Sequence, residues 1–541
     1  MFWKVRSALP AVRHVALLGF EAPKGDDIAG QIAIGLENTL RAELSRAEAR
    51  ERDYWVSTDS ETKATGSDAR AIAQKLGANL ILKGRIEPRM AATNVWLDLL
   101  EAPSGRRLRT AMVSRPRDQL YALTGDTVHS AAKLLNATLP EMAPEGAPRS
   151  AEAYRLYQDA LAKLKENSLR GATSAIPPLQ KVIQLDENFA PAFAVLASAY
   201  SLKYYYTHDL AFLDLTNRNC ERALALNPAL AIVHFRAGVA YRNTGQEEAG
   251  VRELRRALEI DPADFDALTY LGATYETQNQ LVDAEKAYER ILELRPNNWT
   301  AYNLFGDFSR RHGNYRKAEE MFLDVIQLAP TQGAGYTNLA TVYLSTGRYG
   351  AAESRLRKSL SIQTTPAQLT NLGTALFFQG KLAEAERYTL EAIKLGPEND
   401  RRWRNLGDIR LQQGNVEGAL DAYRRALTVV QRQLSATPGN LELVVNAALY
   451  FAKLSERQKA RGMLSRLSNI ASEDLELRLK VAMVDELVGQ RQEALDLLRQ
   501  LLAAGMPMRR ITDSPEFRKI PSESFAGAGL ATVTPGAGNS R

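Results

Sequence analysis

The stretch "NLGTALFFQGKLAEAERYTLEAIKLGP", residues 371–397, decides the fold. It predicts two short amphipathic helices that end at Gly-Pro, because apolar residues recur at a helical spacing in both halves. Packing accounts for most of its residues but not for Asn371, which opens the stretch. Asparagine has a poor helix propensity, yet the chain places one at the same point of several successive helical pairs.

A repeat of 34 residues surrounds this stretch. The prolines that close successive units lie 34 residues apart, at Pro228, Pro262, Pro296 and Pro330. Small residues recur in the second half of each unit, at Gly250, Ala284, Ala318, Ala352, Ala385 and Ala419. "LTYLGATY" (268–275) and "WRNLGDIR" (403–410) are copies of the first half. This is the pattern of the tetratricopeptide repeat, and it predicts about six regular units between residues 231 and 438.

Less regular segments extend the repeats on both sides. Residues 153–187 and 190–228 predict two further helical pairs, and residues 441–467 and 475–501 predict two degenerate ones. We therefore expect about ten hairpins over residues 151–505, stacked as an all-α, right-handed superhelix, or α-solenoid. Residues 506–541 follow as a C-terminal extension. It is expected to be disordered after about residue 521, because its end lacks apolar residues.

Residues 1–136 follow a different pattern, which predicts a small α/β domain with a mixed sheet. "VALLGF" (15–20) and "YWVST" (54–58) predict strands, and residues 26–44 and 68–77 predict helices. Three consecutive strands and a closing helix over residues 118–136 complete the domain. The Pro-rich residues 137–150 are expected to be a linker.

Composition and charge narrow the function classes. Hydrophobic residues make up 45% and charged residues 24%, as in ordinary globular proteins. A net charge of +6 is small for 541 residues and no basic block stands out, which disfavours nucleic acid as a partner. No apolar run is long enough for a signal peptide or a membrane span, so we expect a cytoplasmic protein.

The N-terminal part resembles the TolB-like domain that precedes tetratricopeptide repeats in many bacterial serine/threonine kinases, adenylate cyclases and transcriptional regulators. The resemblance rests on "VALLGFEAPKGDDIAGQIAIGLENTLRAELSR" (15–46), "DARAIAQKLGANLILKGRIEP" (68–88) and "WLDLLEAPSGRRLRT" (96–110). It implies a sensory or scaffold role in bacterial signalling. In that family the effector domain lies upstream, often with a membrane helix between. An extracytoplasmic location would follow if this chain were fused to a lost upstream membrane segment.

The sequence shows no constellation of catalytic or cofactor-binding residues. It lacks the Gly-rich loop, the His-Arg-Asp loop and the Asp-Phe-Gly motif of kinases. Its five histidines show no metal-ligand spacing. We therefore expect no enzymatic activity, no cofactor and no metal. The open alternative is an enzyme whose site lies in the N-terminal domain.

We count each unit from the residue after the closing turn, so that Leu-Gly occupies the seventh and eighth places. Asparagines then recur at the sixth place of four consecutive units, at Asn338, Asn371, Asn405 and Asn446. This place lies beside the groove face of each first helix, and an amide both donates to and accepts from a peptide main chain. The repeats of O-linked N-acetylglucosamine transferase are similar, with an asparagine ladder that holds extended polypeptide. Neighbouring groove positions add a mixed-charge set: Asn303, Asp307, Arg310, Arg401, Arg404 and Asp408. The alternative is that each asparagine bonds to the backbone of a neighbouring helix or belongs to the repeat consensus, and that the charged set is a hydrated surface.

The resulting hypothesis is a non-catalytic scaffold that binds protein or peptide partners in the concave groove of the repeats and that is able to form a homodimer. The alternative is the sensory half of a membrane serine/threonine kinase whose kinase domain is missing from this chain.

Overall fold

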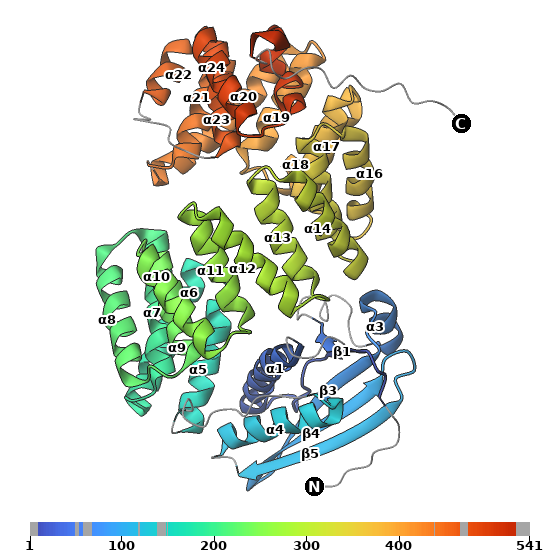
Figure 1. The fold of residues 1–541 in the computed structure, drawn as a ribbon, viewed down its shortest axis with the longest axis vertical. Helices are drawn as coiled ribbons and strands as arrows, with labels where there is room; N and C mark the ends of the chain where they lie inside the picture. The colour runs from blue at the N-terminus through green and yellow to red at the C-terminus, as the bar shows by residue number, and fades with distance from the viewer. Residues whose placement is uncertain are drawn as a thin grey trace. The chain divides into compact units, whose positions relative to one another are not determined.

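The computed structural model describes residues 9–48, 54–57, 68–116, 119–137, 148, 150–437, 439–465 and 474–525. The chain divides into two compact units, Met1–Ala301 and Tyr302–Arg541. Figure 1 shows a mixed α/β part at the N-terminal end of the first unit, and helices in the rest of the chain. The predicted fold class is therefore confirmed. The predicted domain boundaries at residues 136 and 150 stay a prediction, and most of the expected linker lies outside the described residues.

A five-stranded sheet forms the centre of the α/β part, in the order β2-β1-β3-β4-β5. Its strands are β1 (Arg13–Leu17), β2 (Tyr54–Val56), β3 (Leu80–Pro88), β4 (Ala92–Glu101) and β5 (Arg107–Pro116). β1 pairs in parallel with β2 and β3, whereas β3, β4 and β5 form an antiparallel meander. The sheet is thus mixed, as the order of strand and helix patterns predicted.

Helices cover both faces of this sheet. On one face α1 (Asp27–Glu48) and α4 (Leu120–Leu135) bury Leu36, Leu40 and Leu134 against alternate strand residues. On the other face α3 (Ala69–Leu76) buries Ile72 against Ala16 and Ile81. The period-2 alternation of strand side chains explains why both faces are apolar.

Ten pairs of antiparallel helices follow among the described residues. Those of the first unit are α5 (Ala151–Leu164), α6 (Leu169–Leu185), α7 (Ala190–Thr207), α8 (Leu210–Leu226), α9 (Ala231–Asn243), α10 (Glu247–Ile260), α11 (Phe265–Thr277) and α12 (Leu281–Leu294). α13 (Trp299–Arg311) runs from the first unit into the second. The second unit continues with α14 (Tyr315–Leu328), α15 (Gly333–Ser345), α16 (Tyr349–Leu360), α17 (Pro366–Phe378), α18 (Leu382–Leu395), α19 (Asp400–Gln412), α20 (Val416–Ala436), α21 (Leu441–Lys453), α22 (Arg457–Leu464), α23 (Leu475–Val488) and α24 (Arg491–Ala503).

Close approach of the two helices explains the small residues of the repeat. A Cβ atom added to Gly407 of α19 would lie 2.4 Å from Cε1 of Tyr423 on α20. That distance is too short for any real contact, so only glycine allows this packing. At the turn inside the hairpin of residues 371–397, Gly380 has a φ of +75°, a backbone conformation that favours glycine.

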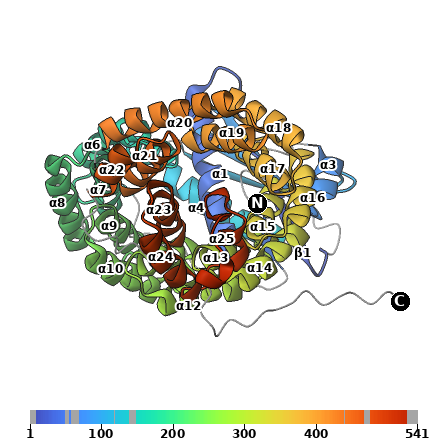
Figure 2. The same cartoon turned by 90° about the horizontal axis from the view of Figure 1, so that it is seen from above.

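The C-terminal extension is folded through Phe525, slightly beyond the predicted end of order near residue 521. It comprises α25 (Met508–Thr512) and two 3-10 turns, Pro515–Phe517 and Ser522–Ser524. Ile511, Phe517 and Phe525 are buried in the core of the last hairpins. Figure 2 shows α25 on the inner side of the arc of helices in the second unit. Residues 526–541, where disorder was predicted, lie outside the described residues.

Candidate functional site

A cavity of about 640 Å³ lies within the second unit. Its wall consists mainly of the first helices of successive hairpins, α13, α15, α17, α19, α21 and α23, and residues 510–516 of the C-terminal extension complete it. Repeat geometry places the first helix of each hairpin on the same side, which brings equivalent positions of the units to one surface.

Nine of the ten predicted groove residues line this cavity. They are Asp307, Arg310, Asn338, Asn371, Arg401, Arg404, Asn405, Asp408 and Asn446. Asn303, the tenth, accepts a hydrogen bond of 2.7 Å from Nδ2 of Asn338. The 34-residue register therefore placed these side chains together correctly, although their binding role stays a prediction.

Three of the four asparagine amides bond to neighbouring helices. Asn338 donates to Asn303 of α13, and Asn405 donates to the Thr374 hydroxyl of α17 at 3.1 Å. Asn446 is buried and both donates and accepts. Asn371 has no hydrogen-bond partner among the described residues, although it lines the cavity. Three of the asparagines thus join helices, but through side chains and not through the neighbouring helix backbone that the alternative predicted.

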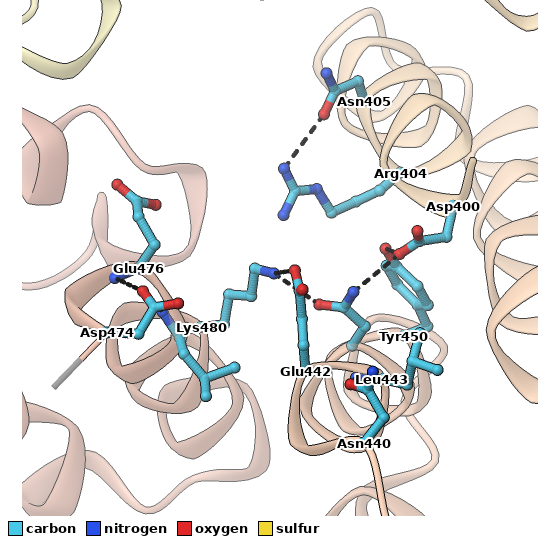
Figure 3. A network of polar contacts seen from close by, with 12 residues as sticks. Asp400, Arg404, Asn405, Asn440, Glu442, Leu443, Tyr450, Asp474, Glu476 and Lys480 are labelled. Carbon is cyan, nitrogen blue, oxygen red and sulfur yellow. Dashed lines mark hydrogen bonds and ion pairs between the residues drawn. The ribbon is translucent and has the colours of Figure 1, made fainter. Parts of the chain in front are cut away.

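Asn446 belongs to a network that joins α19, α21 and α23 (Figure 3). Its amide donates to Asp400 at 3.1 Å and accepts from Lys480 at 2.9 Å. The Tyr450 hydroxyl donates to the same Asp400 at 2.5 Å, and Lys480 also pairs with Glu442. Burial and the adjacent Asp400 charge raise the pKa of Tyr450. These groups satisfy one another, which indicates a structural role for Asn446.

A second buried network fixes the C-terminal extension. The Lys453 ammonium pairs with Asp408 at 2.7 Å and with Glu516 at 2.5 Å. Burial favours the neutral amine, but the two carboxylates outweigh it and raise the pKa of Lys453. The Tyr423 hydroxyl donates to Asp408 at 2.7 Å. Asp408 was predicted as a groove residue, and the structure shows that its charge is matched by Lys453.

The arginines of the cavity fall into two classes. Arg310 pairs with Asp307 at 2.7 Å, and Arg510 pairs with Glu476 at 2.8 Å. Arg401 and Arg404 have no carboxylate within ion-pair distance among the described residues. Desolvation by the surrounding walls, together with the nearby Arg404 and Arg510 charges, lowers the pKa of Arg401 to about 10. In Figure 3 the Arg404 side chain extends from α19 into the space that faces α21 and α23.

Several cavity residues were not predicted from the sequence. Glu442, Tyr450, Glu476 and Lys480 lie on α21 and α23, whose repeats are degenerate, and only Asn446 of these two helices was predicted. Arg510 and Glu516 belong to a segment without any repeat pattern. The buried apolar residues between them, such as Ile511 and Phe517, were the available signal that this extension folds.

The α/β part contains a serine–histidine pair, which bears on the enzyme alternative. His14 Nε2 lies 3.0 Å from Ser57 Oγ, and burial lowers the pKa of His14 to about 4. Ser57 is only 2% exposed, so a substrate could not reach its hydroxyl in this conformation. Within the described residues, no cluster of three or more His, Cys, Asp or Glu side chains could hold a metal ion. Of the helices described, none is long and apolar enough to cross a membrane.

Comparisons with known proteins identify the repeats. Two tetratricopeptide repeat models match residues 231–264 and 370–438, and a PRP39 N-terminal HAT repeat model matches residues 252–363. A comparison with curated proteins gave no match.

Three similar solved structures are each less than 25% identical to this chain. PilF of Pseudomonas aeruginosa is 22% identical and covers 42% of this chain and 96% of its own, with a TM-score of 0.32. The protein TTC0263 of Thermus thermophilus is 21% identical and covers 33% and 98%, with a TM-score of 0.28. Human IFIT1, as a dimer with PPP-AAAA, is 18% identical and covers 57% and 79%, with a TM-score of 0.35. At these scores the similarity carries no functional argument. The chain therefore contains tetratricopeptide repeats, matched over residues 231–264 and 370–438, and a mixed α/β part at its N-terminal end.

Proposed function

We propose that the chain is a non-catalytic interaction scaffold that binds polypeptide in the cavity of the second unit. The observation that carries the proposal is the convergence of Asn338, Asn371, Asn405 and Asn446, from four successive hairpins, on one cavity. Asn371 offers a free donor and a free acceptor there. A peptide main chain needs both, because each residue presents one N–H and one C=O.

The size and polarity of the cavity support a peptide ligand. Its volume of about 640 Å³ is within the usual range for binding pockets. Amide and charged side chains are the largest group in the wall, and apolar side chains such as Leu344, Phe377 and Phe378 lie among them. An extended peptide, whose main chain is polar at every residue, matches such a wall better than a largely apolar small molecule would.

The cellular process in which the scaffold acts is proposed from the resemblance of residues 15–46, 68–88 and 96–110 to the TolB-like domain. This resemblance supports a role in bacterial signalling or regulation, in the cytoplasm. The sensory half of a membrane kinase is the alternative on the same resemblance. An in-frame start codon upstream, or a native protein of clearly larger mass, would favour that alternative.

Peptide retention tests the proposal. The immobilised full chain is incubated with short, N-acetylated and C-amidated peptides of random sequence, and the retained peptide is quantified. Thr341→Trp places a large side chain in the cavity wall, whereas Thr428→Trp adds the same group to an exposed position of α20. We expect the wild type and Thr428→Trp to retain peptide and Thr341→Trp to retain about tenfold less.

Melting curves must first show that the three proteins are equally folded. Equal retention by both tryptophan variants would place peptide binding outside the cavity. No retention by the wild type would reject the peptide-binding function itself.

A further inference from the structure

The charges that line the cavity are largely paired within the protein. Six carboxylates and five cationic side chains face it. Three ion pairs join lining residues to one another: Arg310–Asp307, Arg510–Glu476 and Lys480–Glu442. The lining residues Asp408 and Glu516 pair with the buried Lys453, which does not itself line the cavity. The last carboxylate, Asp400, accepts from Tyr450 and Asn446.

Arg401 and Arg404 are the exceptions within the described residues. They lie three positions apart on α19, which places both side chains on the same face of the helix. Arg401 lines the cavity, and its side chain makes no hydrogen bond to any described residue. Arg404 donates one long bond of 3.4 Å to Asn405, and its buried Nε has no partner. A guanidinium has five N–H donors, and a buried donor without an acceptor is unfavourable. The unpaired N–H donors of Arg401 and Arg404 indicate a ligand that supplies hydrogen-bond acceptors.

The balance of charge selects the kind of acceptor. Because carboxylates outnumber cations along the wall, the cavity does not favour a multiply charged anion such as a phosphate group. A single carboxylate fits better, since the planar guanidinium binds it through two parallel hydrogen bonds.

The position of α19 selects the source of the carboxylate. The wall runs from α13 through α15 and α17 to α19, and then on to α21 and α23. A peptide extended along these helices would therefore place residues on both sides of α19. The group that meets Arg401 and Arg404 is then a side chain within the peptide rather than its end.

We propose that Arg401 and Arg404 form a subsite for the carboxylate side chain of an aspartate or glutamate within the bound polypeptide. This inference rests on the proposed function. The subsite adds sequence preference to a cavity in which the amide of Asn371 is placed to bond the peptide main chain, which is the same at every residue.

The test uses the same peptide pool and sequences the retained peptides. The wild-type chain is compared with Arg401→Gln/Arg404→Gln and with Arg424→Gln, which removes a cation from the exposed face of α20. We expect the wild type and Arg424→Gln to enrich one acidic position, and the double variant to lose that enrichment. For a matched pair of peptides that differ by Glu to Gln, the wild type should bind the Glu peptide about tenfold more tightly or better. The ratio should fall to about one in the double variant.

The outcomes separate this inference from the proposed function. Retained peptides without an acidic preference, or with a preference that survives in the double variant, would overturn the subsite and leave peptide binding intact. A preference only for peptides with a free C-terminal carboxylate, tested with a non-amidated pool, would also overturn it. Failure of the wild type to retain any peptide would reject both. Melting curves for all variants exclude a folding defect as the cause.

Discussion

Equivalent residues of successive repeats have different roles in this molecule. Asn371 and Asn446 occupy the same place of their hairpins, yet the first amide has no partner among the described residues and the second is buried with two. The difference arises because α23 and the start of α19 supply Lys480 and Asp400 next to Asn446. A repeated residue therefore keeps its position, while its chemistry depends on its neighbours.

Substitution by alanine should separate these two roles. Asn446→Ala removes the hydrogen bonds to Asp400 and from Lys480, which keep only Tyr450 and Glu442 respectively, so the free energy of unfolding should fall by about 1–3 kcal/mol. Asn371→Ala removes no bond and should change it by less than about 0.5 kcal/mol. Denaturant unfolding measures both. A large loss for Asn371→Ala would show that its amide has a structural partner after all.

The stability of the first unit should depend on His14 in mild acid. Burial lowers the pKa of His14 from 6.5 to about 4, so between these values the unfolded chain binds more protons than the folded one. The His14 contribution is therefore present above pH 6.5 and is lost as the pH falls towards 4. Lowering the pH from 7 to 4.5 should decrease the Tm of His14→Gln less than the Tm of the wild type, as measured by thermal unfolding at each pH. His129→Gln, at an exposed position of α4, serves as the control and should follow the wild type.

Within the elements, pairs of helices depend on a few close contacts. The Cβ test at Gly407 shows why glycine occupies the eighth place of that repeat, where α19 meets α20. The C-terminal extension is fastened instead by polar contacts of its charged side chains with three helices. Arg510 pairs with Glu476 of α23, Glu516 pairs with Lys453 of α21, and Asp513 accepts a hydrogen bond from Tyr349 of α16.

Glycine substitutions should test the helix contact. Gly407→Ala forces a methyl group against Tyr423 and should destabilise the second unit by about 1–3 kcal/mol. Gly350→Ala in α16 meets no atom within 4 Å, so its higher helix propensity should stabilise the unit by up to about 1 kcal/mol. Urea unfolding provides the comparison. Equal effects of the two changes would contradict the packing argument.

Loss of one buried cation should loosen the C-terminal extension. Lys453→Met leaves Asp408 and Glu516 buried without a counter-charge, and the expected cost is about 3–5 kcal/mol. Lys459→Met removes an exposed cation from the next helix and should cost less than about 1 kcal/mol. Hydrogen exchange of residues 508–525 should rise strongly in the first variant only. Unchanged protection there would show that apolar contacts alone hold the segment.

For the molecule as a whole, two compact units with their own cores make a single unfolding transition unexpected. Hydrogen exchange in increasing denaturant should show residues of Met1–Ala301 and of Tyr302–Arg541 losing protection at different concentrations. Coincident loss of protection throughout the chain would contradict this expectation.

Much of this architecture could be predicted from sequence, because it depends on local patterns. The spacing of proline, glycine and alanine predicted six regular hairpins, weaker helical patterns predicted four more, and short apolar runs predicted the strands. The same register brought nine of the ten proposed site residues to one cavity. What could not be predicted depends on contacts distant in sequence. The bond of Asn446 to Asp400 spans 46 residues and that of Tyr349 to Asp513 spans 164, and neither leaves a periodic signal.

The C-terminal extension also has a consequence for the order in which the protein is made. Synthesis proceeds from the N-terminus, so residues 508–525 emerge only after every hairpin that they fasten. Any hairpin of the second unit that folds during synthesis does so without Arg510 and Glu516 in place. The wall of the cavity is completed last. On a nascent chain, Lys453 lacks its ion pair with Glu516 and Glu476 lacks its ion pair with Arg510 until residues 508–525 have been synthesised.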